Sequence, residues 1–231
     1  MSQRAKRYLR RRGFVVGLLT LGLLYVPVTV VGTQEAVVVN FSQEKDPVPD
    51  GWELSENDGK ANLALVPDGG TQALKLRSNS SSFSLNKELV IDLTKTPYLE
   101  WQWKVTELPK GGDFRKSATD DQAAQLYVVL YWGYFKKQVI AYIWDSTAPV
   151  GTTEKISPPI PFMTVHAVVV RSGDKKLGKW VTETRNVVED YKKLFGSKVK
   201  EVQAIRIQIN SQHTKSEAES YWRLVRFKAQ P

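Results

Sequence analysis

Hydrophobic and polar positions alternate along three segments in the middle of the chain, residues 98–105, 123–132 and 139–145. In the first segment Trp101 and Trp103 fall on one face, and charged or amide side chains fall on the other. Alternation with a period of two predicts strands that are buried on one side. We expect these three strands to lie in one sheet, with one face in the core and the other open to a ligand.

The aromatic side chains of these segments divide between the two expected faces. Trp101 and Trp103 alternate with charged or amide neighbours, and Trp132 shares a face with Leu126, Val128 and Leu130. All three tryptophans are interpreted as core residues. Tyr142 and Trp144 share a face of the third segment and are assigned to the open side, where their rings would form flat apolar platforms.

Similar short segments continue on both sides of this region. Strands are predicted at residues 37–41, 52–54, 62–66, 73–77, 83–85, 89–93, 164–171, 179–185, 202–210 and 221–227. Asp68-Gly69-Gly70 predicts a hairpin turn. Residues 146–163 contain four prolines and are expected to be irregular.

One helix is predicted, between an Asn186 cap and Gly196, with Glu189 three residues after the cap. Many short strands with a single short amphipathic helix are typical of an all-β protein. We therefore predict an antiparallel jelly-roll-type β-sandwich that occupies residues 36–231.

The first 35 residues have a different composition. Six Arg and Lys residues lie within positions 4–12, and residues 14–32 carry no charged side chain. This order is typical of a secretory signal, with cleavage before Thr33, or of an uncleaved membrane anchor. Both interpretations predict a periplasmic domain, either soluble or anchored to the inner membrane by residues 14–32.

The formal net charge of +9 does not indicate a nucleic-acid-binding protein, because most of the excess lies in this N-terminal run. The rest of the chain is nearly balanced in charge. Cysteine is absent, which excludes disulfides and thiolate metal sites.

Several short motifs occur in a characteristic order. They are Trp101-x-Trp103-Lys104, Lys116 to Val128 with Asp120-Asp121 and Tyr127, Tyr142-x-Trp144, Val169 to Gly173, and Trp180 to Gly196 with Glu183, Arg185 and Asp190. Residues 36–228 resemble an uncharacterised family of exported bacterial proteins, a domain of unknown function. The resemblance implies a β-sandwich similar in outline to galactose-binding-like and carbohydrate-module jelly rolls. At Asn210–Thr214 the chain departs from the acidic run that such proteins tend to carry.

Polar residues at alternating positions suggest a ligand-binding cleft. Its candidate residues are Lys104, Asp120, Asp121, Tyr142, Trp144, Glu183, Arg185 and Gln208. Rings that stack on sugar faces, beside groups that hydrogen-bond hydroxyls, suit a carbohydrate. The alternative interpretation is a ladder of charges across neighbouring strands.

The loop at residues 110–121 contains three carboxylates that are candidate ligands for a cation. Asp113, Asp120 and Asp121 are oxygen donors of the kind that calcium prefers. The same carboxylates are equally suited to pair with Arg115 and Lys116. No other cofactor is indicated.

The chain contains neither a Gly-x-Ser-x-Gly elbow nor a His-Glu-x-x-His motif. The leading hypothesis is therefore a non-catalytic exported protein that binds a polysaccharide or another polar ligand. The first alternative is a tethered accessory subunit that uses the same face to bind a membrane-protein complex. The second is a weak glycoside hydrolase or lyase, with Glu100 and Glu183 as a candidate carboxylate pair.

Overall fold

The computed structural model describes residues 35–133, 136–156 and 162–231. The predicted signal or anchor at residues 14–32 lies outside these residues. Within the described residues, the structure contains no helix that is both long enough and apolar enough to cross a membrane.

The described residues form two β-sheets. The six-stranded sheet has the order β11 (Val181–Asn186), β6 (Tyr98–Glu107), β13 (Glu217–Lys228), β4 (Thr71–Asn79) and β3 (Leu63–Asp68), and β1 (Glu35–Asn40) also pairs with β13. The seven-stranded sheet has the order β2 (Glu53–Asp58), β5 (Ser82–Asp92), β12 (Glu201–Asn210), β7 (Ala124–Gly133), β8 (Lys136–Asp145), β10 (Met163–Ser172) and β9 (Thr153–Ile156).

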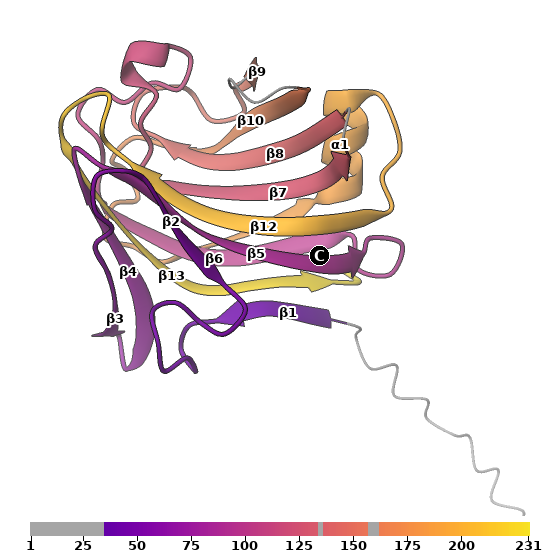
Figure 1. Ribbon diagram of the computed structural model, residues 1–231, viewed down its shortest axis with the longest axis horizontal. Coiled ribbons are helices and arrows are strands. Elements are labelled where there is room, and N and C mark those ends of the chain that lie inside the picture. Colours follow the sequence, from indigo (N-terminus) through magenta and orange to yellow (C-terminus); the bar gives the residue numbers. More distant parts are fainter. Residues whose placement is uncertain (1–34, 134–135, 157–161) are drawn as a thin grey trace, which may run out of the picture. The chain divides into compact units, whose positions relative to one another are not determined.

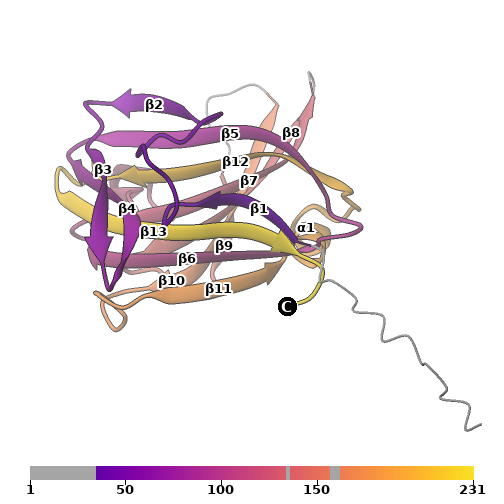
Figure 2. The ribbon, with the colours of Figure 1, turned by 90° about the horizontal axis from the view of Figure 1, so that it is seen from below.

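The two sheets pack face to face as a β-sandwich (Figures 1 and 2). Alternate side chains of both sheets enter one continuous apolar core, which contains Leu74 of β4, Leu126 of β7 and Ile207 of β12. The helix α1 (Val187–Phe195) lies beside the ends of β7 and β8 in Figure 1, and its Tyr191 hydroxyl donates to Gln138 of β8. The all-β sandwich predicted from the sequence is thus confirmed.

Aromatic rings occupy the centre of this core. Trp101, Trp103, Trp144 and Trp222 are each 0% exposed. The Trp103 ring packs 5.4 Å from that of Trp222 and 5.8 Å from that of Trp144, which joins the two sheets. Buried rings of this size contribute large apolar areas, so the tryptophans dominate the stability of the sandwich. The prediction that Trp101 and Trp103 are core residues is confirmed, and the Trp132 side chain lies outside what the structure describes.

The predicted arrangement of the three central strands is wrong. β6 belongs to the six-stranded sheet, whereas β7 and β8 belong to the seven-stranded sheet. The loop before β7, which includes a short 3-10 helix at Ser117–Thr119, carries the chain from one sheet to the other. Period-two alternation shows which side chains of a strand share a face, but it does not show which strands pair.

The local signals at the hairpin and the helix are confirmed. β3 and β4 pair through Asp68 and Thr71, and Gly69 and Gly70 between them have φ of 59° and 80°. Asn186 caps α1 by accepting from the Glu189 N–H, and Gly196 ends the helix at φ 67°. Backbone in this left-handed region favours glycine, so the sequence signal has a direct physical cause.

Three further predictions need correction. Residues 83–85 and 89–92 belong to one strand, β5, and the stretch expected to be irregular contains β9. The predicted antiparallel pairing fails at β8 and β10, which are parallel. A parallel pair needs a long connection, and here it is provided by residues 146–162.

Candidate functional site

The outer face of the seven-stranded sheet, which points away from the core, carries a second apolar cluster. Its side chains come mainly from β8 and β10, and Phe114, Ala148 and Ile156 pack over them. This covering leaves Val139 and Ala167 each 1% exposed. Both faces of β8 and β10 are therefore largely buried. The strands beyond them present an open surface, and Ala141, Ile143, Val165 and Ala167 form an apolar wall beside it.

A groove crosses this open surface, made of two adjoining depressions. The strand lobe, about 700 Å³, is lined by Glu53, Ser55, Asn86, Glu88, Gln203 and Ala204 among others. The loop lobe, about 490 Å³, is lined by Asp120, Gln122, Gln125, Gln208, Asn210 and His213 among others. Tyr127, Met163 and Arg206 line both lobes, so the two form one continuous groove.

Side-chain amides organise the floor of the loop lobe. Gln125 of β7 donates to the Asn210 Oδ1 atom at 2.6 Å and accepts from the Tyr127 hydroxyl at 2.7 Å. Asn210 in turn donates to the Asp120 carbonyl oxygen at 2.7 Å. Because each group fixes its neighbour, the polar floor has a defined set of donors and acceptors before any ligand arrives.

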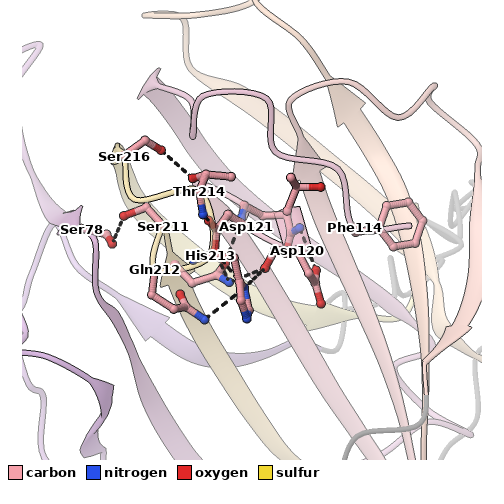
Figure 3. Close-up of polar contacts among 12 residues, drawn as sticks. Ser78, Phe114, Asp120, Asp121, Ser211, Gln212, His213, Thr214 and Ser216 are labelled. Carbon is pink, nitrogen blue, oxygen red and sulfur yellow. Dashed lines mark hydrogen bonds and ion pairs between the residues drawn. The ribbon is translucent and has the colours of Figure 1, made fainter. Parts of the chain in front are cut away.

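Asp121 holds the loop that forms the rim of this lobe (Figure 3). Its carboxylate is 0% exposed and accepts from the backbone N–H of Thr214 at 2.6 Å and of His213 at 3.3 Å. The His213 ring lies beside the same carboxylate, with Nδ1 3.3 Å from Asp121 Oδ1 and 3.1 Å from the Asp120 carbonyl oxygen. Asp121 therefore holds the rim loop in place by hydrogen bonds and positions the His213 ring at the edge of the groove.

Asp120 is the half-buried carboxylate of the loop lobe. Burial raises its pKa above the ordinary value, although a hydrogen bond from Gln122 at 3.0 Å and the nearby His213 act in the opposite direction. The groove thus contains a carboxyl group that holds its proton more tightly than a surface aspartate.

Three of the eight predicted site residues belong to this region. Asp120 and Gln208 line the loop lobe, and Asp121 lies directly behind it. The Gln208 side chain is half-buried and has no hydrogen-bond partner among the described residues, so its amide faces the groove unpaired.

Tyr142 and Trp144 do not lie on the open face, and this prediction is wrong. Both are 0% exposed within the main core, where Tyr142 stacks on Trp101 at 5.3 Å. The Tyr142 hydroxyl donates to Asp190 at 2.7 Å, and burial raises its pKa well above the ordinary value. The side chains of β8 do alternate between two faces, as predicted. Because both faces are buried, the alternation does not show which of them packs against the other sheet.

Glu183 and Arg185 share a face of β11, as predicted, but that face lies away from the groove. Glu183 is paired with Arg171 and accepts from the Trp103 indole at 3.3 Å. Arg185 forms a fork with Asp190, with its Nε 2.8 Å from Oδ2. Glu183, Arg185 and Asp190 line a separate pocket of about 260 Å³ beside α1, and each of the two carboxylates is paired with its own arginine.

Lys104 lies on the outer face of the six-stranded sheet. It pairs with Asp68 at 2.7 Å and lies 4.2 Å from the centre of the Tyr221 ring. Trp180 donates to the same Asp68 carboxylate at 2.8 Å. Lys104 and Gln208 therefore lie on different sheets. Lys104 belongs to a ladder of charges across neighbouring strands and not to the groove.

The three aspartates proposed for a cation are each engaged separately. Asp113 accepts from Arg115 Nε at 2.7 Å and from Nη2 at 2.9 Å, and these bonds lower its pKa despite its burial. Asp121 is occupied by the rim loop. Within the described ranges no three acidic, histidine or cysteine side chains gather in a way that suits a metal ion.

Sequence reasoning did not select Tyr127, Asn210, His213 or Arg206 as site residues. The alternation of residues 202–210 already placed Arg206 on the same face as Gln208 and Asn210. The missing information was the pairing of β12 with β7 and β5, which brings Tyr127 and Asn86 next to Arg206.

Comparison with solved structures finds distant sandwiches. The glycoside hydrolase domain of Endo-D from Streptococcus pneumoniae R6 is 9% identical, with a TM-score of 0.40, over 78% of this chain and 22% of that one. The xyloglucanase domain of NopAA from Sinorhizobium fredii is 12% identical, with a TM-score of 0.45, over 78% of this chain and 95% of that one. A structure of carbohydrate-binding modules from the beta-sandwich superfamily is 14% identical, with a TM-score of 0.39, over 84% and 62%. At these values the similarities carry no argument about activity.

No curated protein matches the chain. Residues 50–226 match a family model described as "Protein of unknown function (DUF3047)". The match covers most of the sandwich, including every residue that lines the two lobes of the groove. On this basis the chain belongs to the DUF3047 family.

Proposed function

We propose that this protein binds a saccharide in the groove on the outer face of its seven-stranded sheet, without turnover. The observation that carries the proposal is the composition of the loop lobe, where a pre-ordered row of amides faces an apolar wall. Sugars present C–H faces and hydroxyl edges at once, so they are bound best where both kinds of surface meet.

The side-chain amides of the loop lobe support this function because one of them, that of Gln208, forms no hydrogen bond within the described part of the protein. Gln122, Gln125 and Asn210, by contrast, are bonded to protein groups and hold the floor in place. A hydroxyl needs a donor and an acceptor close together, and amides provide both.

Tyr127 also supports saccharide binding in the groove. Its ring lines both lobes, and its hydroxyl is fixed on Gln125. Burial raises the pKa of this phenol, so it remains a neutral hydrogen-bonding group throughout the physiological range. A ring held in this way is a preformed stacking surface.

Binding without turnover is favoured by the distribution of carboxylates. A glycosidase places two carboxyl groups on opposite sides of the scissile bond. Asp120 is the single carboxylate among the described residues that line the loop lobe, and the strand lobe adds the exposed Glu53 and Glu88. Glu100 and Glu183, the pair considered from the sequence, do not line the groove and are occupied by Arg226 and Arg171.

The test is calorimetric titration of a panel of neutral and acidic oligosaccharides into the wild-type protein and two groove variants. We expect Tyr127→Ala and Gln208→Ala each to weaken binding about tenfold, which corresponds to about 1.4 kcal/mol. Thr182→Ala is the matched control, because Thr182 is exposed on β11 of the other sheet.

The proposal fails if no oligosaccharide in the panel binds. It also fails if a saccharide binds equally well to the wild-type protein and to both groove variants, because the binding surface then lies elsewhere. Release of reducing ends during the titration would instead favour the hydrolase.

Export belongs to the proposal as well. The basic run and the uncharged residues 14–32 support delivery of the domain to the periplasm, followed by cleavage before Thr33 or by retention at the inner membrane. Retention would favour the accessory-subunit alternative, in which the groove binds a protein partner. Intact mass of the protein from membrane and soluble fractions distinguishes the two.

A further inference from the structure

One arginine lies at the centre of the groove. Arg206 on β12 is half-buried and lines both the strand lobe and the loop lobe. A ligand that extends along the groove must therefore pass this side chain.

Arg206 differs from the other arginines of the described residues. The other six all form ion pairs with carboxylates: Arg77, Arg115, Arg171, Arg185, Arg223 and Arg226. Arg206 forms none with any described residue, and the remaining residues of the chain contain no Asp or Glu. Its charge is therefore not neutralised by a carboxylate of this chain.

Neutral groups hold the side chain in place instead. The Arg206 Nε atom donates to Asn86 Oδ1 at 2.6 Å, and the guanidinium carbon lies 5.8 Å from the centre of the Tyr127 ring. Asn86 is itself fixed, because its Nδ2 atom donates to Ser55 Oγ at 3.0 Å. The guanidinium is thus oriented through Nε, while its two terminal nitrogens donate to no described residue.

This arrangement is not explained by a lack of acidic neighbours. Glu53 and Glu88 line the strand lobe and are exposed, yet neither pairs with Arg206. A pre-oriented guanidinium with free terminal nitrogens matches two oxygens of a carboxylate or phosphate, and such charge-assisted forks are the strong form of hydrogen bond.

We propose that the saccharide bound in this groove carries an anionic substituent, and that Arg206 is the residue that recognises it. This inference rests on the proposed function and adds the class of ligand. The shared chemistry is an oxyanion on the sugar, either the carboxylate of a uronic acid or a phosphate ester. Asn86 acts as a positioning residue for the guanidinium.

The experiment compares pairs of probes that differ only in charge. Hexagalacturonate and its fully methyl-esterified form test a carboxylate, and phosphorylated and unmodified maltohexaose test a phosphate. Each is titrated into the wild-type protein, Arg206→Gln, Arg206→Lys and the control Thr182→Ala, with thermal unfolding to verify that every variant is folded.

We expect the wild-type protein to bind the charged member of one pair at least about tenfold more tightly than its neutral partner. Arg206→Gln should remove this preference by weakening binding of the charged partner far more than binding of the neutral one, and Arg206→Lys should retain part of it. Asn86→Ala should reduce the preference without altering the charge of the groove, since it releases the guanidinium from its position.

Equal affinity for charged and neutral partners overturns the inference but leaves the proposed function intact. The same holds if Arg206→Gln weakens both members of a pair alike, because the side chain then contributes only shape. Failure of all four probes to bind overturns the inference, and the proposed function then depends on the wider panel.

Discussion

The outer faces of the two sheets are both rich in polar residues, yet they use them in opposite ways. On the six-stranded sheet, Glu219 accepts from Lys75, Arg77 and Thr106, and Glu100 pairs with Arg226 and Lys228. On the seven-stranded sheet, the groove is lined by side-chain amides, a tyrosine and an arginine, and this arginine has no carboxylate partner.

The two faces differ in how much of their hydrogen-bonding capacity the protein itself uses. The ion pairs of the first face satisfy one another across β4, β6 and β13 and leave little for a ligand. The second face keeps donors and acceptors that the protein does not use. Unused hydrogen-bonding capacity beside an apolar wall is what distinguishes the groove from the ladder.

The largest effect is expected from a residue that lies on neither outer face. Trp144→Ala should lower the free energy of unfolding by about 3–5 kcal/mol, because it leaves a large cavity between the sheets. Urea-induced unfolding monitored by circular dichroism measures the change. If the variant kept its stability and lost only ligand binding, Trp144 would line the groove and not the core.

Glu219→Gln should break the ladder on the six-stranded sheet. The change removes the shared acceptor of Lys75 and Arg77, and we expect a loss of about 2 kcal/mol at neutral pH. Glu217→Gln is a matched control on the same strand, because Glu217 is more exposed and should cost less than about 1 kcal/mol. Saccharide binding should be unchanged in both variants, and a loss of binding would show that the ladder is part of the site.

The same carboxylate predicts a dependence on pH. Burial alone would raise the pKa of Glu219, but hydrogen bonds from Lys75, Thr106, Tyr221 and Arg77 outweigh it and lower the value from 4.5 to about 2. The unfolded chain therefore binds this proton more readily than the folded protein. The resulting stabilisation is complete above pH 4.5 and is lost as the pH falls toward 2. Stability measured across this window should fall less steeply in Glu219→Gln than in the wild-type protein.

Asp121→Asn is expected to have a smaller effect, on the rim of the groove. The amide cannot accept all the hydrogen bonds that the carboxylate receives from Thr214, His213 and Asn210, so we expect a loss of about 1–2 kcal/mol. Hydrogen exchange at the Thr214 backbone N–H should become faster, and ligand affinity should fall with it. Unchanged exchange would show that the loop is held by its other contacts.

Much of the fold was predictable because its signals are local. The hairpin at Gly69-Gly70 and the helix between Asn186 and Gly196 depend on backbone conformations that few residues adopt. The alternation of Trp101 and Trp103 reflects burial within a single strand, and it was assigned correctly. These features need only neighbours in the chain, which the sequence contains.

The site was predictable only in part, as Gln208 and Trp144 illustrate. Both alternate with side chains of opposite character, but Gln208 faces the groove and Trp144 faces the core. For β8, alternation leaves two choices of face, and the choice depends on Phe114, Ala148 and Ile156, which cover its outer side. No property of residues 139–145 alone contains that information.

The sequence by itself determined that this protein is an all-β sandwich with a tryptophan-rich core, because period and turn chemistry act over a few residues. The tertiary structure decided which strands pair, which face of β8 enters the core, and where Arg206 stands among Asn86 and Tyr127. Strand pairing and the covering of a sheet join residues that are far apart in the chain. Their outcome is therefore set by the packing of the whole domain.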